Sequence, residues 1–200
     1  MLSMRDTYNS IAKDFDKTRY AMWPCVKEFY KSNTRGYCID VGCGNGKNVP
    51  PGSAQWYELC DLCDSFVELC ASKYPQSGVC QVNGLHLPYR TGVFDTVISV
   101  AVVHHLNTHD LRVSFVCELL RVLKPGGKGL ITCWARTDAQ PQDRNVPWHD
   151  RATGKTTQRY YHMFDPMELE SLFSEMDCTV QTYYEHNNHI GVFTKHVRTL

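Results

Sequence analysis

The chain has 200 residues, enough for one domain with a buried core, and its content of 42% apolar and 12% aromatic residues excludes an intrinsically disordered chain. Its 21 Lys and Arg side chains balance its 21 Asp and Glu side chains. Proteins that bind nucleic acid unaided usually carry a basic surplus, because neutralising phosphates supplies most of their affinity. The balance therefore disfavours unaided nucleic-acid binding, although it would not reveal a local basic patch. Because no linker, repeat or low-complexity tract occurs, residues 1–200 are interpreted as a single domain.

No segment has the pattern of a targeting or membrane signal. Residues 1–8 lack the apolar stretch of a signal peptide. The longest apolar run, Val97–Val103, is too short to span a bilayer and is interrupted by Ser99. We therefore expect no membrane association and a cytoplasmic protein, with the nucleus as a second location.

The ten cysteines lie mostly within apolar helix or strand patterns. Cys60 and Cys63 form one C-x-x-C pair, but no second pair or Cys/His cluster completes a tetrahedral metal site. We interpret the cysteines as small buried side chains in a reducing compartment, with a metal or redox role as the alternative. No bound metal is expected.

The first half of the chain alternates helices and strands. Tyr8, Ile11, Ala12 and Phe15 have the spacing of one helix face. Ser65 and Glu68 have the spacing of a capping box, which predicts a helix start. The predicted helices are a first helix around 8–15, a second beginning near Pro24 and a third over 65–74, and the predicted strands are 37–41, 56–60, 79–82 and 94–101.

The second half adds one strand after a helix over 111–123, which Pro125-Gly126-Gly127 should end. Residues 136–158 are polar and contain two prolines, which predicts a long loop. Asp165-Pro166-Met167-Glu168 has an N-cap, a first-turn proline and a third-position glutamate, which predicts a helix start. The remaining predicted strands are 130–134, 178–184 and 190–195.

This alternation predicts an α/β fold with a doubly wound, mostly parallel sheet. No helix separates the last two strands, so they should form a C-terminal antiparallel pair.

A glycine-rich turn follows the first predicted strand, in the segment Asp40–Gly46. Doubly wound folds bind ligands at such a turn, where glycines allow close approach of the backbone. A dinucleotide fingerprint would place its last glycine at position 47, where this chain has Lys47. The glycines instead fall at Gly42, Gly44 and Gly46, a spacing that resembles motif I of the class I methyltransferases. The resemblance implies S-adenosyl-L-methionine as cofactor and a Rossmann-like class I fold.

Two further groups follow the next strands. Asp61 lies 21 residues after Asp40, in a position from which a carboxylate can accept both ribose hydroxyls. Asn83-Gly84-Leu85 follows the third strand and could hold the adenine edge, and Val100 at the end of the fourth strand completes the predicted cofactor set. A lone glycine motif is more often a simple turn, and Asp61 alone could be a surface acid. Their placement after successive strands favours a cofactor site.

Beyond motif I, the chain resembles the eukaryotic tRNA carboxymethyluridine methyltransferases, which esterify 5-carboxymethyluridine at the wobble position. The Ala-Val-Val-His-His and Arg-Tyr-Tyr-His runs are specific to that family. Pro50-Pro51 and Asn83 depart from its pattern, and Asn83 stands where an aspartate is usual. The resembling segments are 8–12, 18–20, 23–24, 40–47, 99–105, 133–135, 146–148, 159–162 and 187–189.

The resemblance implies a reaction, partners and catalytic residues. The acceptor would be the carboxylate of 5-carboxymethyluridine in the tRNA anticodon loop, and a small zinc-binding activator subunit would accompany the enzyme; no DNA is expected. A carboxylate is ionised at neutral pH, so the reaction needs no general base but needs a cation on the oxygen that does not attack. Arg19 is the first candidate for that cation, with His105 and Arg159 behind it; Arg19 could equally be a solvated arginine at a helix end.

Several polar and aromatic residues are predicted to bind the substrate. Each of them also has an ordinary structural explanation. His104 and His105 after the fourth strand could be loop residues, and Trp134 could belong to the core. The Arg-Tyr-Tyr-His run could be an edge strand. Such cations, aromatics and imidazoles are also used to hold unstacked RNA bases. The predicted substrate-binding residues are His104, Trp134, Tyr160, Tyr161, His162 and His189.

Two other function classes stay open from the sequence. One is a small-molecule O-methyltransferase, because the fold says little about the acceptor. The other is a binding subunit that keeps the fold without catalysis. The presence of Asp40, three loop glycines and Asp61 argues against the second.

Overall fold

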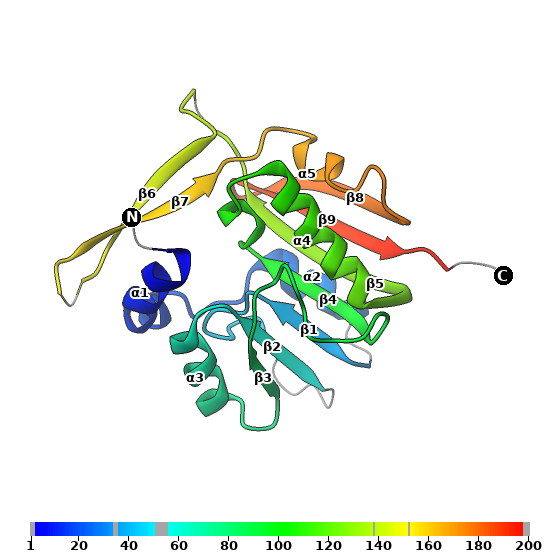
Figure 1. Ribbon diagram of the computed structural model, residues 1–200, viewed down its shortest axis with the longest axis horizontal. Coiled ribbons are helices and arrows are strands. Elements are labelled where there is room, and N and C mark those ends of the chain that lie inside the picture. The colour runs from blue at the N-terminus through cyan, green and yellow to red at the C-terminus, as the bar shows by residue number, and fades with distance from the viewer. Residues whose placement is uncertain (1–2, 34–35, 51–55, 138, 152, 198–200) are drawn as a thin grey trace.

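The computed structural model describes residues 3–33, 36–50, 56–137, 139–151 and 153–197. Within these ranges a seven-stranded sheet has the order β3-β2-β1-β4-β5-β9-β8 (Figure 1). Neighbouring strands from β3 to β5 are parallel, whereas β9 is antiparallel to β5 and β8. The predicted mostly parallel sheet with a C-terminal antiparallel pair is confirmed. The strands are β1 Cys38–Val41, β2 Tyr57–Asp61, β3 Gly78–Gln81, β4 Phe94–Val100, β5 Leu123–Trp134, β8 Cys178–Glu185 and β9 Asn188–Lys195.

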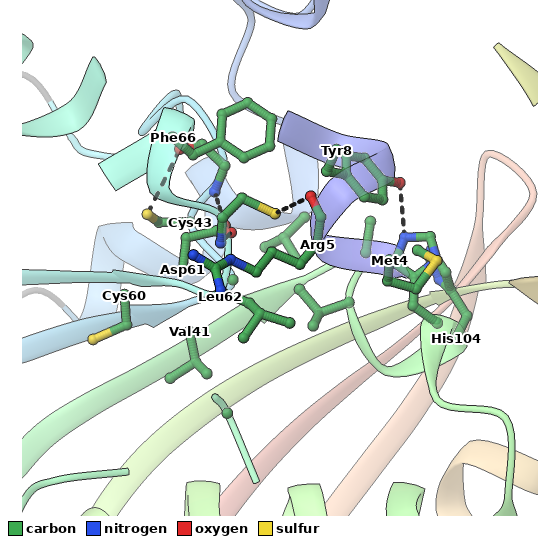
Figure 2. Close-up of a pocket in the computed structure, with 18 of the residues that line it drawn as sticks. Met4, Arg5, Tyr8, Val41, Cys43, Cys60, Asp61, Leu62, Phe66 and His104 are labelled. Atoms are coloured by element: carbon green, nitrogen blue, oxygen red, sulfur yellow. Dashed lines mark hydrogen bonds between the residues drawn. The ribbon is translucent and has the colours of Figure 1, made fainter. Parts of the chain in front are cut away.

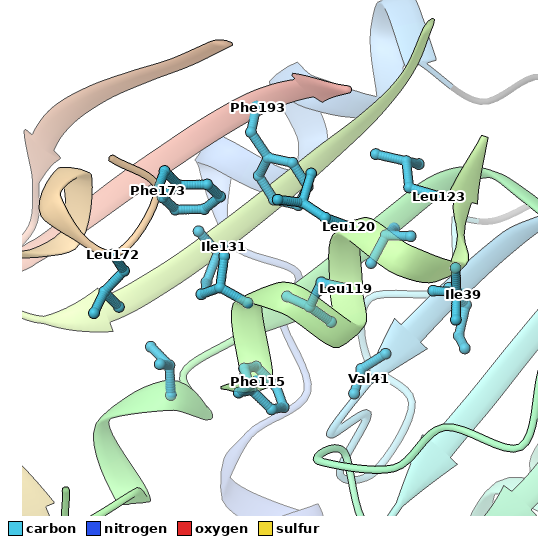
Figure 3. Close-up of a cluster of buried hydrophobic side chains, with 14 of the residues drawn as sticks. Ile39, Val41, Phe115, Leu119, Leu120, Leu123, Ile131, Leu172, Phe173 and Phe193 are labelled. Carbon is cyan, nitrogen blue, oxygen red and sulfur yellow. The ribbon is translucent and has the colours of Figure 1, made fainter. Parts of the chain in front are cut away.

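Helices cover both faces of the sheet, as expected for a doubly wound fold. On one face, α2 (Pro24–Asn33) buries Phe29 in a cluster that includes Cys38 of β1. On the other face, α4 (His109–Val122) packs Phe115 and its neighbours against Ile39 of β1. Ile39 follows Cys38 in the strand, so its side chain points to the opposite face of the sheet. Figure 3 shows this second cluster between α4 and the strands. The central parallel strands β1 and β4 are therefore buried on both faces, as their mostly apolar sequences indicate.

Helix α1 (Met4–Thr18) lies outside these two layers and packs against α3 (Asp64–Lys73) and β7 (Thr156–His162). Its N-cap is Ser3, whose hydroxyl accepts the backbone N–H of Asp6 at 3.1 Å. The predicted apolar face of this helix is confirmed, because its members are buried or packed in a cluster with α3.

The capping box predicted from Ser65 and Glu68 is not formed. Helix α3 begins at Asp64 and its N-cap, Cys63, makes no side-chain cap bond. The N–H of Cys63 instead donates to Oδ1 of Asp61, and that of Ser65 donates to the side chain of Asn9 in α1. A tertiary partner, Asn9, thus satisfies the Ser65 N–H that the sequence assigned to a local cap.

Residues 136–158 were expected to be a long loop, and this expectation is wrong. Strands β6 (Asp143–His149) and β7 pair antiparallel as a separate two-stranded sheet that extends past α1 (Figure 1). The local pattern hides this hairpin because one face is polar and solvent-exposed and Pro147 interrupts β6. A proline is tolerated there because β6 is an edge strand.

Two other boundaries differ from expectation. Helix α4 ends before Pro125 as predicted, but β5 begins at Leu123 rather than at 130, so the Pro-Gly-Gly segment lies within a strand. Helix α5 is short, Glu168–Ser171, and begins three residues later than the N-cap predicted at Asp165. Glu168 still accepts the backbone N–H of Asp165 at 3.1 Å, which is one half of a capping box.

Residues 42–50 after β1 form turns without a helix, and Pro51 lies outside the described residues. All ten cysteines are free thiols and seven are buried, which agrees with a packing role. In the described part of the chain, no three His, Cys, Asp or Glu side chains gather as a metal site would require. None of the helices described has the length and apolar character needed to cross a membrane.

Candidate active site

A cavity of ≈ 320 Å³ opens at the C-terminal ends of the parallel strands. Its walls come from the turns after β1 to β4, from the end of β5, and from α1 and β7. Figure 2 shows Met4 and Tyr8 of α1 at the same cavity as Asp61, Leu62 and Phe66. This edge is where doubly wound sheets bind their ligands.

The glycine loop after β1 is shaped by two close approaches. Gly42 has φ +79°, and a Cβ there would lie 2.3 Å from Val102 Cγ2 in the turn after β4. A Cβ on Gly46 would lie 2.5 Å from the ring of Tyr74 in the same way. Gly42 and Gly44 line the cavity, whereas Gly46 faces away from it. Glycine is therefore required at 42 and 46 for packing and backbone conformation.

The carboxylate of Asp61 faces the cavity in a fixed orientation. Its Oδ2 accepts the backbone N–H of Gly44 at 2.8 Å, and its Oδ1 accepts that of Cys63 at 2.9 Å. Burial raises the pKa of Asp61 above its usual range, and these two hydrogen bonds oppose that rise. Each carboxylate oxygen can accept a second bond. Asp61 can therefore accept hydroxyl donors from a ligand.

Asp40 lies beneath the glycine loop and does not line the cavity. It is 1% exposed, and neither carboxylate oxygen has a hydrogen-bond partner among the described residues. Burial raises the pKa of Asp40 to about 7. The nearby negative charge of Asp61 adds to this rise, whereas the side chain of Asn48 and the charge of Lys47 oppose it. Asp40 is placed to act on a bound cation through its charge rather than by direct contact.

The turns after β3 and β4 form the opposite wall. Asn83, Gly84, Leu85 and Val100 all line the cavity. The side-chain oxygen of Asn83 accepts the N–H of Leu85 at 3.0 Å, which leaves the amide N–H groups for a ligand. A Cβ on Gly84 would lie 2.5 Å from the ring of Phe115, so the turn needs glycine to pack on α4.

His104 and His105 follow β4 and both line the cavity. His104 Nδ1 accepts the backbone N–H of Trp134 at 3.2 Å, and its ring stacks on Tyr161 with centroids 4.8 Å apart. His105 Nδ1 lies 2.9 Å from the carbonyl oxygen of Tyr160, so that nitrogen must donate. Burial lowers the pKa of His104 well below its usual value and that of His105 to about 4. Both rings are neutral at physiological pH.

A chain of hydrogen bonds connects α1, β7 and the turn after β4. Because Nδ1 of His105 carries the proton, its Nε2 accepts from the hydroxyl of Tyr8 at 2.9 Å. Tyr161 donates to Tyr8 Oη at 3.3 Å, and Arg159 Nη1 donates to Tyr161 Oη at 2.8 Å. Both nitrogens of His105 are thus engaged within the protein.

Arg159 is a buried cation at the cavity wall, 7% exposed. Its guanidinium carbon lies 5.0 Å from the ring centroid of Trp148 and 5.1 Å from that of Tyr161. Its Nε has no hydrogen-bond partner, and no carboxylate of the described residues lies within the ion-pair distance of 4.0 Å. A buried charge is costly unless it is paired. The geometry therefore suits an anionic ligand.

Arg19 is the C-cap of α1, and it contacts the same tryptophan as Arg159. Its guanidinium carbon is 5.3 Å from the ring centroid of Trp148. Its backbone carbonyl accepts Nδ2 of Asn45 in the glycine loop at 2.7 Å, which ties this arginine to that loop. Lys47 also lines the cavity, and its Nζ lies 5.3 Å from the ring centroid of Trp23.

Comparison with known proteins agrees with this geometry. The sequence profile of a family described as "Methyltransferase domain" matches residues 39–131. The tRNA (carboxymethyluridine(34)-5-O)-methyltransferase of Schizosaccharomyces pombe is 34% identical over 197 residues, which cover 84% of this chain and 85% of that protein. The chain belongs to the tRNA (carboxymethyluridine(34)-5-O)-methyltransferase family. The resemblance stated from the sequence is thereby confirmed.

This chain spans less than half of the length of some curated relatives. The relative from Xenopus tropicalis is 29% identical over 94% of this chain, which spans 40% of that protein. The relative from Arabidopsis thaliana is 41% identical over 70% of this chain, which spans 33% of that protein.

Solved structures show the same fold. An S-adenosylmethionine-dependent methyltransferase from Clostridium acetobutylicum has a TM-score of 0.73 at 10% identity, over 95% of this chain and 99% of that one. The S-adenosylmethionine-bound amino pentose methyltransferase CalS10 has a TM-score of 0.67 at 16% identity, over 97% of this chain and 92% of that one. The fold is that of the class I methyltransferases.

The cofactor of this family domain is S-adenosyl-L-methionine, and the residues present fit it. Asp61 offers acceptor positions for the ribose hydroxyls, and the loop around Gly42 and Gly44 leaves room for close approach of a ligand. The buried carboxylate of Asp40, without a partner in the described residues, suits a ligand that carries positive charge. The carboxylate of the cofactor could pair with the cations of Arg19 and Lys47, which both line the cavity.

The structure brings most of the predicted site residues together at the cavity. The predicted members that line it are Arg19, Gly42, Gly44, Asp61, Asn83, Gly84, Leu85, Val100, His104, His105, Trp134, Arg159 and Tyr161. Asp40 and Gly46 support the loop from outside it.

Three predicted substrate-binding side chains lie elsewhere. The hydroxyl of Tyr160 donates to Asp143 at 2.5 Å, and only its carbonyl contacts the site, through His105. The ring of His162 lies between Asp143 and Glu168, at 2.8 and 2.6 Å. His189 pairs with Cys133 in the sheet and does not line the cavity. Alternation along β7 explains the first two, because Arg159 and Tyr161 face the cavity and their neighbours face away.

Sequence reasoning missed three contributors. Tyr8 was interpreted only as part of a helix face, Lys47 only as the residue that excludes a dinucleotide motif, and Trp148 only as part of a family segment. All three lie within segments that resemble the family, which is the one signal that could have found them.

Proposed function

We propose that this chain uses S-adenosyl-L-methionine to methylate the carboxylate of 5-carboxymethyluridine at the wobble position of tRNA, giving the methyl ester. The names of its relatives support tRNA wobble methylation. The guanidinium of Arg159 at the cavity wall is buried and has no carboxylate partner among the described residues. It supports a carboxylate as the methyl acceptor, because a buried cation favours an anionic ligand.

The histidines support an acceptor that needs no base. His105 has both ring nitrogens bonded within the protein, and burial keeps the pKa values of both histidines below neutrality. Neither ring is therefore arranged to take a proton from a hydroxyl or amine. A carboxylate, with a pKa of about 4 by analogy with side-chain carboxyls, is already ionised at neutral pH.

We assign the two arginines to different anions. Arg159 connects through Tyr161 to the turn after β4, so it would hold the acceptor carboxylate by the oxygen that does not attack. Arg19 is tied to the glycine loop through Asn45, so it would face the carboxylate of the cofactor. This reverses the order of candidates taken from the sequence, because burial makes Arg159 the cation with the greater need of a partner.

In this proposal the protein works by positioning. Bound S-adenosyl-L-methionine supplies an electrophilic methyl group, which passes to the carboxylate oxygen and leaves S-adenosylhomocysteine. Arg159 orients the carboxylate and keeps its charge in place. The rings of Trp134, Tyr161 and His104, with centroids 4.5–5.7 Å apart, form an aromatic wall suited to a flipped-out uridine base. Packing of α1 over the cavity would limit access of water.

We further propose a small zinc-binding activator subunit, as the family resemblance implies, and a cytoplasmic or nuclear location. Strand β3 ends the sheet order, so its outer edge can pair with another chain. Next to it, Leu62 lines the cavity and is 40% exposed. A partner on this edge would cover apolar surface near the cofactor. Full activity of a rigorously monomeric preparation on tRNA would contradict this partner.

The experiment that tests the function is a nucleoside analysis of tRNA by mass spectrometry. Cells lacking the protein should accumulate 5-carboxymethyluridine and lose its methyl ester. Purified enzyme with labelled cofactor should then esterify that tRNA in vitro, while a metabolite extract should take up no label. Unchanged wobble nucleosides in the deletion cells, together with labelling of a metabolite, would overturn the proposal.

A further inference from the structure

Trp148 of β6 contacts both arginines of the cavity without lining it. The guanidinium carbons of Arg159 and Arg19 lie 5.0 and 5.3 Å from its ring centroid. The face of an indole attracts a cation because its π electrons make that face negative. The second ring on Arg159 is Tyr161, at 5.1 Å. Two aromatic rings therefore fix the position of Arg159.

The tryptophan ring is itself held in place by α1. Its indole N–H donates to Oδ2 of the buried Asp14 at 3.1 Å, and its ring stacks on Phe15 with centroids 5.7 Å apart and planes at 28°. Trp148 is buried as well. Because the ring is fixed by a hydrogen bond and a stacking contact, it can restrict the position of a guanidinium that lies over it.

Aromatic support has a consequence that an ion pair would not have. A carboxylate partner would also orient Arg159, but it would neutralise the charge and occupy the same N–H donors that an acceptor carboxylate needs. Ring faces leave the charge of the guanidinium in place and occupy none of its N–H donors with a carboxylate oxygen. The Nε of Arg159 has no partner in the described residues, and only Nη1 is used, by Tyr161.

We propose that Trp148 is a positioning residue for Arg159 and that its ring face sets the preference of the site for a negatively charged acceptor over a neutral one of the same shape. This role rests on the proposed function. It predicts that loss of the ring face weakens binding of the charged acceptor specifically, while the neutral acceptor binds as before.

The test compares two anticodon stem–loop RNAs that differ in one group. One carries 5-carboxymethyluridine at the wobble position and the other carries its neutral amide, 5-carbamoylmethyluridine. Dissociation constants are measured for the full chain, with its partner subunit if one copurifies, saturated with S-adenosylhomocysteine. The readout is the ratio of the amide to the carboxylate dissociation constant. A purely structural defect would weaken binding of both RNAs and leave this ratio unchanged.

Three variants give the comparison. Trp148→Met, which fills similar space without a ring face, should lower the ratio by about fivefold, and Trp148→Phe should keep it within about twofold of the wild type. The matched control is Trp56→Met, because Trp56 is half-exposed and does not line the cavity. It should leave the ratio unchanged.

A folded Trp148→Met protein with the wild-type ratio would overturn the role. If that variant does not fold, a fluorinated tryptophan placed at position 148 decides, because it keeps the shape and weakens the negative face of the ring. An unchanged ratio in that protein overturns the role too. A wild-type enzyme that shows no preference and no esterification refutes the proposed acceptor itself, and the wild-type measurements alone identify that failure.

Discussion

Tyr8 Oη lies 2.9 Å from Nε2 of His105, and this contact joins α1 to the turn after β4. Burial raises the pKa of Tyr8 well above its usual value and lowers that of His105 to about 4. Both groups therefore stay neutral, and the tyrosine donates. The bond places α1 over the end of the sheet where the acceptor would bind.

Replacing Tyr8 by Phe should destabilise the protein and slow turnover. The change removes the donor to a buried imidazole nitrogen, which should lower the free energy of unfolding by about 1–3 kcal/mol. Urea denaturation measures the first effect, and the methylation assay measures the second. Tyr20→Phe is the matched control, since Tyr20 is 81% exposed and should be neutral. Equal stability of the Tyr8 and Tyr20 variants would contradict the role of the contact.

Asp61→Ala should abolish cofactor binding far more than it disturbs folding. Each hydroxyl bond to the carboxylate is worth about 1.5–3 kcal/mol, so a loss of one or more orders of magnitude in affinity is expected by calorimetry. Asp110→Ala is the control, since the side chain of Asp110 is fully exposed and does not line the cavity. An affinity for S-adenosyl-L-methionine within twofold of the wild type would show that Asp61 does not hold the ribose.

Alanine variants of the two arginines should differ in which quantity they change, kcat/KM on tRNA or the affinity for the cofactor. Arg159→Ala should lower kcat/KM on tRNA by about tenfold to a hundredfold, the size of one charge-assisted hydrogen bond, with little change in cofactor affinity. Arg19→Ala should mainly weaken cofactor binding. The opposite pattern, with normal cofactor affinity and slow turnover in Arg19→Ala, would restore Arg19 as the residue that holds the acceptor.

Cofactor affinity should rise with pH around neutrality. Burial raises the pKa of Asp40 to about 7, so the carboxyl is mostly protonated at pH 6 and mostly ionised at pH 8. The ionised form favours a cationic ligand, so the free enzyme should bind S-adenosyl-L-methionine up to about tenfold more tightly at pH 8. The cofactor's own amine titrates in the same range, and Asp40→Asn isolates its contribution. If wild type and Asp40→Asn show the same pH dependence, Asp40 does not titrate there.

At saturating cofactor and tRNA, kcat should be nearly flat above about pH 6 after correction for stability. The acceptor carboxylate needs no deprotonation, and His105 has a pKa of about 4 and both nitrogens engaged. Stopped assays from pH 6 to 8 provide the measurement. A kcat that climbs tenfold per pH unit would demand a base and would refute the carboxylate acceptor.

The sequence was sufficient to predict the parallel sheet, the glycine loop and the place of Asp61 at the cavity. Buried strands are apolar along their whole length, and a ligand-binding turn needs glycines next to such a strand, so both signals are local. The same local pattern failed for residues 136–158, where one exposed polar face and Pro147 concealed the hairpin of β6 and β7.

The acceptor end of the site was decided by tertiary contacts. Trp148 and Asp14 are 134 residues apart in the chain, and Tyr8 and Tyr161 are 153 apart. No periodicity of helix or strand records such pairs, because it reports only which side of an element is buried. The sequence therefore supplied both Arg19 and Arg159 as candidate cations and ranked Arg19 first. Only the packing of β6 and β7 against α1 distinguishes them. It buries Arg159 against the rings of Trp148 and Tyr161, out of reach of any carboxylate in the described residues, and leaves Arg19 exposed at the end of its helix.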